Sequence, residues 1–130
     1  MPALMDKPRA YRLPALQLAF IGDTVCDLLT RTELMFTSRP VGEMHARAAS
    51  VVNARAQAAQ LERIAHLLGD EEREIVLRAR NAHPGHTIPQ AASREQYMKA
   101  TAFEALMGYL YLTGQMRRAQ ELYHLSRIKE

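Results

Sequence analysis

Hydrophobic residues along most of the chain recur at steps of three and four positions, which is the spacing of one face of an α-helix. No sustained two-residue alternation bounded by hairpin turns is present, so the pattern gives no support for β-strands. We therefore predict an all-α fold in which the helices pack as a compact bundle around a shared apolar core.

The pattern divides into five expected helices, with approximate ranges 13–36, 40–68, 70–81, 93–114 and 116–127. In the first of these, Leu13, Leu16 and Phe20 form an apolar stripe that we expect to face the core. Gly69 is a typical helix terminator, and Asp70 is expected to cap the third helix. The shape predicted by these elements is a helical bundle without an interdomain linker.

The composition is that of an ordinary globular chain. With 130 residues, 48% of them hydrophobic, it is long enough to form one core, so we expect a single domain over residues 1–130. The first twelve residues hold no apolar run, and no stretch is apolar enough to span a membrane, so neither a targeting segment nor a membrane partner is expected. Cys26 is the only cysteine, which excludes an internal disulfide and fits a reducing compartment. We therefore expect a soluble cytoplasmic protein.

The balance of charges changes this picture only slightly. A formal net charge of +3 and a pI of about 9.3 favour partners that carry phosphate. Composition alone does not decide the point, because many basic proteins bind no acidic partner. The arginines would have to lie together on the surface for the charge to select nucleic acid.

Two acidic residues stand in apolar stretches where the helical pattern requires no charge. Asp23 is the only charged residue in the segment 13–26, and Glu104 is the only one in the segment 100–116. An ionised carboxylate among apolar side chains is costly unless a cation or several hydrogen-bond donors compensate it. A divalent cation shared by both carboxylates would supply that compensation, because hard cations such as Mg²⁺ prefer oxygen ligands.

A metal ion held in this way activates water and stabilises the charge that builds on phosphorus, so the two acids predict hydrolysis of phosphodiester bonds. Gly22, directly before Asp23, is expected to leave room for a nucleic-acid backbone. Taken singly, each acid has an equally good structural explanation. Asp23 could be a buried acid satisfied by backbone groups or a tyrosine, and Glu104 could face solvent. Two such acids on two core helices favour the metal site.

The sequences around the two acids resemble those of the ribonuclease III family. The string LAFIGDTVCDLL, which contains Asp23, is similar to the signature segment of the ribonuclease III domain, and ATAFEALMGYLYL, which contains Glu104, is similar to its second acidic segment. The stretches VGEMHARAASVVNARAQA and LRARNAH are similar to those of the short Mini-III subgroup. The resemblance covers the chain from about Leu13 to Leu125, and the two acidic segments together are a specific signal.

This resemblance implies a ribonuclease III-like helical bundle that acts as a homodimer on double-stranded RNA. Each protomer is then expected to cut one strand with a metal-bound carboxylate cluster, leaving 5′ phosphates and short 3′ overhangs. By position, Asp23 and Glu104 would be the catalytic and metal-binding acids, with Mg²⁺ as cofactor and Mn²⁺ as a possible substitute. The subgroup lacks a separate double-stranded RNA-binding domain and trims ribosomal RNA precursors, which would be the substrate here.

The chain departs from larger members of the family at two further acidic positions. Those members carry a glutamate seven residues before the signature aspartate and an aspartate three residues before the second glutamate, where this chain has Leu16 and Thr101. The Mini-III subgroup is similar to this chain in both respects, so an active enzyme is still implied. The number of bound metal ions, one or two, stays open, because fewer anionic ligands hold a second ion more weakly. Asp27, one turn after Asp23, could support the site or be an ordinary surface acid.

Duplex RNA is bound mainly through its shape, phosphates and 2′-hydroxyls, which requires a surface rich in donors and positive charge. The densest such patch runs from the end of the third helix into the segment 83–92, where HPGHTIPQAA predicts a loop. Its members are Arg78, Arg80, Asn81, His83 and His86. The alternative is that the arginines only complement the helix dipole. A zinc site at the two histidines is not expected, because no third ligand stands at a suitable spacing.

Arg55 interrupts the apolar stripe of the second expected helix, which indicates a groove or an interface. Its aliphatic stem could equally lie along the surface with the charge in solvent. Two other functions stay open beside the nuclease. A non-catalytic RNA-binding scaffold with the same fold would bind duplex RNA without magnesium-dependent cleavage. A plain helical interaction module would show no RNA affinity that falls with salt.

Overall fold

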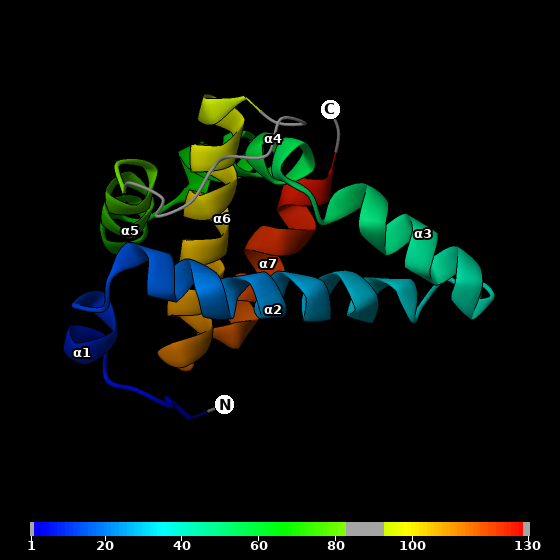
Figure 1. The fold of residues 1–130 in the computed structure, drawn as a ribbon. Coiled ribbons are helices and arrows are strands. Elements are labelled where there is room, and N and C mark those ends of the chain that lie inside the picture. Colours follow the sequence, from blue (N-terminus) through cyan, green and yellow to red (C-terminus); the bar gives the residue numbers. More distant parts are fainter. Residues whose placement is uncertain (1, 83–92, 129–130) are drawn as a thin grey trace.

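The computed structural model describes residues 2–82 and 93–128, and over these residues every regular element is a helix, which confirms the predicted all-α fold (Figure 1). Within this part of the chain, no helix has the length and apolarity needed to cross a membrane. The elements in order are α1 (Lys7–Tyr11), α2 (Ala15–Leu34), α3 (Val41–Val51), α4 (Ala54–Ile64), the 3₁₀ turn η1 (Ala65–Leu67), α5 (Asp70–Arg80), α6 (Arg94–Leu112) and α7 (Met116–Arg127).

Helix α6 is the centre of the bundle. It packs against α2, α4 and α5, and Figure 1 shows α2 crossing it near its middle. Ser93 caps α6 by accepting a hydrogen bond from the backbone N–H of Gln96, at 3.0 Å, and Gly114 follows its end with a positive φ of 76°. From Ala100 to Leu110 every side chain of α6 except that of Glu104 is buried, among them Phe103, Leu106 and Leu110. A residue on α6 is therefore held rigidly by the core.

Two glycines let α2 and α6 approach until their backbones touch. A Cβ atom on Gly22 would lie 1.6 Å from the carbonyl oxygen of Glu104, and one on Gly108 would lie 2.1 Å from the carbonyl oxygen of Leu18. Neither position has space for any side chain. The crossing therefore brings the residue after Gly22, which is Asp23, next to Glu104. The expectation that Gly22 leaves room for nucleic acid is wrong, because the backbone of α6 fills that space.

The structure differs from the expected helices in three places. The second expected helix is broken, because the side chain of Asn53 accepts a hydrogen bond from the N–H of Ala56 at 2.9 Å and so begins a new helix. Gly69, and not Asp70, is the N-cap of α5; its N–H donates to the Glu72 carboxylate at 2.8 Å. The short helix α1 was not expected, and Asp6 caps it.

The expected inward stripe of the first helix is largely on the surface. Phe20 is 82% exposed and Leu16 is 38% exposed, and Leu28, further along α2, is 52% exposed. Helix α2 has apolar residues on nearly all its faces, so the three-and-four spacing did not identify which face is buried. The face that meets the core holds Ala15, Leu18, Ala19, Gly22, Val25, Cys26 and Leu29. A second apolar face therefore remains uncovered in the single protomer.

Candidate active site

The two isolated acids lie side by side where α2 crosses α6. The Asp23 and Glu104 carboxyl groups lie close enough to interact directly, although 81 positions separate them in the sequence. Asp23 is exposed and Glu104 is half-buried. The acids are therefore brought within reach of one shared ligand, with Asp23 on the open side and Glu104 anchored in the core. The exposure of Asp23 differs from the apolar environment expected from its neighbours, because those neighbours, Leu16 and Phe20, are exposed as well.

Burial and the neighbouring acid make Glu104 a weak acid in this structure. Its pKa rises from 4.5 to about 8, first because burial removes water from the carboxylate and second because Asp23 shares a hydrogen bond and a like charge with it. The Gln57 side chain acts in the opposite direction and lowers the Glu104 pKa. Burial, followed by the charge of Glu104, also raises the pKa values of Cys26 and Tyr97. The site therefore has a net negative field and a carboxyl group that keeps a proton near neutral pH.

No ion pair among the described residues neutralises either acid. Asp27, one turn along α2, is paired with Arg31 at 3.3 Å, but Asp23 and Glu104 have no such basic partner in the described part of the chain. Two facing carboxylates without a cation fit an oxygen-binding metal ion such as Mg²⁺. Within residues 2–82 and 93–128, no cluster of three or more histidine, cysteine or acidic side chains is placed to share one ion. This protomer would therefore contribute two carboxylates, and water or phosphate oxygens would fill the remaining positions.

Three further positions were candidates for metal ligands, and none of them adds a free oxygen ligand in the structure. Thr101 is buried, and its hydroxyl donates a hydrogen bond to the carbonyl of Tyr97 at 2.9 Å. Leu16 lies on the partly exposed face of α2. Asp27 is half-buried and paired with Arg31, which is typical of an ordinary surface ion pair. Asp23 and Glu104 are therefore the two residues that define the site.

We expect the raised pKa of Glu104 to make the metal-free protein less stable as the pH rises from about 5 to about 8. Over that window the folded protein keeps the Glu104 proton, whereas the unfolded chain, with a carboxyl pKa of 4.5, has lost it. Rising pH therefore favours the unfolded chain. Urea midpoints in a chelating buffer at pH 5, 6.5 and 8 measure the slope, which Glu104→Gln should flatten and the exposed Glu74→Gln should not. An unchanged slope in Glu104→Gln would contradict the pairing.

The predicted RNA-binding patch is only partly on the surface. Arg78 is half-buried, where its Nη2 donates to the Leu13 carbonyl at 3.2 Å and its guanidinium lies 4.9 Å from the centre of the Tyr11 ring. These contacts give Arg78 a role within the protein and weigh against contact with RNA. Arg80 and Asn81 are exposed at the end of α5. His83 and His86 lie outside the described residues.

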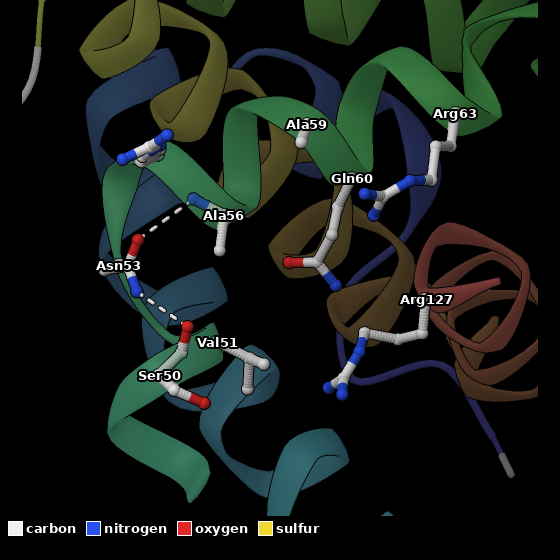
Figure 2. Close-up of a pocket in the computed structure, with 9 residues that line it drawn as sticks. Ser50, Val51, Asn53, Ala56, Ala59, Gln60, Arg63 and Arg127 are labelled. Atoms are coloured by element: carbon white, nitrogen blue, oxygen red, sulfur yellow. Dashed lines mark hydrogen bonds between the residues drawn. The ribbon is translucent and has the colours of Figure 1, made fainter. Parts of the chain in front are cut away.

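Arg55 lines a pocket of about 570 Å³ that is formed by the α3–α4 junction, α4 and the end of α7 (Figure 2). Arg63 and Arg127, which lie near each other in Figure 2, line the same pocket. Arg63 donates to the Ser126 carbonyl at 2.8 Å, and Arg127 pairs with Glu33 at 3.5 Å. Arg55 therefore borders a groove, and because its side chain is exposed, the structure is equally consistent with a charge that simply lies in solvent. Neither acid of the candidate site lines this pocket.

The sequence pattern did not identify one residue of the site, Gln57. Gln57 is buried on α4 and contacts Glu104 on α6. A signal for it was present, because Gln57 stands four residues before Leu61 and seven before Ile64, on the helix face that those two residues mark as buried. A glutamine on such a face requires a polar partner inside the protein.

This geometry can be compared with known proteins. Residues 16–115 match the model of the ribonuclease III domain family, a range that includes both acids. The chain therefore belongs to the ribonuclease III family. It is also similar to a crystal structure of a protein from Fusobacterium nucleatum, with a TM-score of 0.80 and 26% sequence identity over 92% of this chain and 94% of that one. The all-helical ribonuclease III-like fold is thereby confirmed.

Curated relatives define the group within the family. A Mini-ribonuclease 3 of Thermoanaerobacter sp. (strain X514) is 41% identical over 95% of this chain and 87% of its own length. A Mini-ribonuclease 3 of Symbiobacterium thermophilum is 40% identical over 85% of each chain. Within the ribonuclease III family, the chain belongs to this Mini-ribonuclease III group, and its enzyme class is that of an endoribonuclease, a hydrolase. Enzymes of this family generally depend on a divalent metal ion.

Proposed function

We propose that this chain is a magnesium-dependent endoribonuclease that hydrolyses phosphodiester bonds of double-stranded RNA, with Asp23 and Glu104 as the metal-binding and catalytic acids. The observation that carries the proposal is the pair of adjacent carboxyl groups at the α2–α6 crossing, which no described basic residue neutralises. A bound Mg²⁺ ion, or Mn²⁺ in its place, would supply a Lewis acid and activate a water molecule there.

The two acids support this chemistry in different ways. Asp23 is exposed and can meet a phosphate of the substrate directly, whereas Glu104 is fixed by the core on α6. The closeness of α2 and α6 at Gly22 holds the two carboxyl groups together before any substrate arrives. Such preorganisation avoids the cost of moving charged groups into position during the reaction. Because water is the nucleophile, no covalent intermediate with the protein is required.

A homodimer is the proposed assembly. Phe20, Leu16 and Leu28 make the outward side of α2 partly apolar, with polar residues between them, and the same helix carries Asp23. Exposed apolar faces of this kind are typical of protein interfaces, and a two-fold axis would bring two copies of α2 together. The two acid pairs would then lie on one assembly, each pair assigned to one strand of the duplex. Residues 1–130 would form one catalytic domain in each protomer.

We expect Phe20→Ser to weaken the dimer by roughly 30-fold or more in dissociation constant, because loss of a large anchor at an interface typically costs at least about 2 kcal/mol. Phe20 is 82% exposed, so the fold of the protomer should be unaffected. Sedimentation velocity over a range of concentrations measures the change. Leu77→Ser on α5 is the matched control, because Leu77 is also exposed but lies on another helix. A monomeric unmodified protein would contradict the proposed assembly.

Contacts with RNA are proposed for the patch at the end of α5 and the segment that follows. Arg80 and Asn81 are exposed there, and His83 and His86 follow in the sequence. Positive charge and donors at this position suit the phosphates of a duplex. Ribosomal RNA precursors are the proposed natural substrate, in the cytoplasm, where the free thiol of Cys26 would stay reduced.

Cleavage of a labelled RNA duplex by the purified protein tests the proposed function. We expect products with 5′ phosphates in the presence of Mg²⁺, no cleavage with a chelator, and recovery when Mg²⁺ or Mn²⁺ is restored. Parallel binding measurements at two salt concentrations should give an affinity that falls with salt, since phosphate contacts release counterions. Duplex binding without metal-dependent cleavage would overturn the proposal in favour of a non-catalytic scaffold.

A further inference from the structure

Gln57 is a polar residue in an apolar position. It is 4% exposed and lies on the face of α4 that also carries the buried residues Leu61 and Ile64. This face packs against α6, which carries Glu104. Buried side-chain amides almost always have hydrogen-bond partners, so the partner of Gln57 indicates what the residue does.

The neighbour that Gln57 meets on α6 is the carboxyl group of Glu104. The two side chains are close enough for a hydrogen bond that favours the ionised carboxylate. The Nε2 atom of Gln57 nevertheless completes no hydrogen bond of standard geometry with any described group. Together these observations describe a donor, Gln57 Nε2, that lies beside the Glu104 carboxyl group without completing a hydrogen bond of standard geometry to it.

Stability does not account for such a residue. A buried donor without an aligned acceptor destabilises the fold, and an apolar side chain of the same size would avoid that cost. The second buried glutamine of α4 behaves differently, because Gln60 donates from Nε2 to the Ser126 hydroxyl of α7 at 3.1 Å and only its Oε1 lacks a described partner. Gln60 therefore ties two helices together on the wall of the pocket in Figure 2, whereas Gln57 faces the acid pair.

We propose that Gln57 is a positioning residue, which holds the Glu104 carboxylate in the orientation that presents one of its oxygens to a divalent cation shared with Asp23. The inference rests on the proposed function of the acid pair. A carboxylate has two oxygens, so Glu104 can accept from Gln57 Nε2 with one of them while the other faces Asp23. Hydrogen bonds of this kind to metal-binding carboxylates fix their orientation and support affinity for the metal.

The variant Gln57→Met tests the proposal, because methionine keeps the length of the side chain and removes the amide. We expect Mn²⁺ binding, measured by electron paramagnetic resonance or calorimetry, to weaken about tenfold or more. The Mg²⁺ concentration for half-maximal cleavage should rise by a similar factor. In chelating buffer the thermal midpoint should stay the same or rise, because a poorly satisfied buried amide has been removed.

Gln60→Met is the matched control, since it is also a buried glutamine of α4 but bonds to Ser126. Its thermal midpoint should fall while its Mn²⁺ affinity stays at the unmodified value. Unchanged Mn²⁺ affinity in Gln57→Met would overturn the inference, with or without a lower thermal midpoint. Gln57→Leu gives the same comparison if the methionine variant does not fold. Failure of the unmodified protein to bind Mn²⁺ in an Asp23-dependent way would instead refute the proposed acid site, which separates the two outcomes.

Discussion

Asp23→Asn and Glu104→Gln each lower the rate of duplex cleavage by a factor of roughly 10²–10³ or more if the two acids hold the catalytic metal ion. Each amide keeps the shape of the side chain but removes one of the two anionic ligands that this protomer offers. With no described basic residue paired to either acid, nothing else in this part of the chain replaces the lost charge on the metal. We expect the loss chiefly in kcat at saturating RNA, because RNA binding depends on contacts elsewhere.

Single-turnover cleavage of a labelled duplex at high enzyme concentration measures this effect, and circular dichroism checks that each variant is folded. Asp27→Asn is the matched control, because Asp27 lies one turn further on the same helix and is paired with Arg31. Its rate should stay within a few-fold of the unmodified enzyme. In chelating buffer, Asp23→Asn should also be at least as stable as the unmodified protein near neutral pH, since it removes a like charge beside Glu104. Full activity in either acid variant would refute the site.

The class of the fold and the acid pair could be predicted from the sequence for the same reason. A charge in a long apolar helix is rare unless something compensates it, so Asp23 and Glu104 were conspicuous despite the 81 positions between them. The three-and-four spacing of apolar residues likewise persists in every long helix. The spacing of apolar residues and the isolation of Glu104 both depend on burial, whereas Asp23 is exposed and stood out only because its neighbours are apolar.

The buried face of α2 could not be predicted, because apolar residues lie on every side of its first two turns. Phe20 is as hydrophobic as any core residue, yet it is 82% exposed in the protomer. Periodicity distinguishes faces only where polar residues mark one of them, and Gln17 is the only polar residue in the first two turns of α2. The face of α2 is chosen instead by Gly22, since only a residue without a Cβ allows α6 to approach. That choice depends on two segments meeting in space and is not visible in either segment alone.

The break between α3 and α4 and the role of Gln57 were missed for a related reason. Apolar spacing continues across the break, and the signal that outweighs it is a single cap, the hydrogen bond of Asn53 with Ala56. Gln57 then follows one turn into the new helix, where its position relative to Glu104 depends on the start that Asn53 sets. Local capping thus fixes the placement of a residue that acts on a distant helix.

Gly22→Ala should destabilise the protein by about 3 kcal/mol or more, the upper end of what overpacking usually costs. The new Cβ would lie 1.6 Å from the Glu104 carbonyl oxygen, and since that atom is backbone, no rotamer change relieves the clash. The helices must separate, which disturbs both the core and the spacing of Asp23 and Glu104. Urea unfolding measures the loss of stability, and cleavage by the remaining folded protein reports the change in spacing.

Gly42→Ala is the control that isolates this effect from the general preference of helices for alanine. Gly42 lies in α3, and a Cβ there would meet nothing within 4 Å. This variant should be neutral or more stable by up to about 1 kcal/mol, because alanine favours the helix and has less freedom to lose. A loss of stability in Gly22→Ala together with no loss in Gly42→Ala would mean that the contact with α6, and not helix propensity, requires glycine at position 22. Equal effects would show that α2 and α6 are not held in backbone contact at Gly22. That contact could then no longer explain the fixed spacing of the two acids.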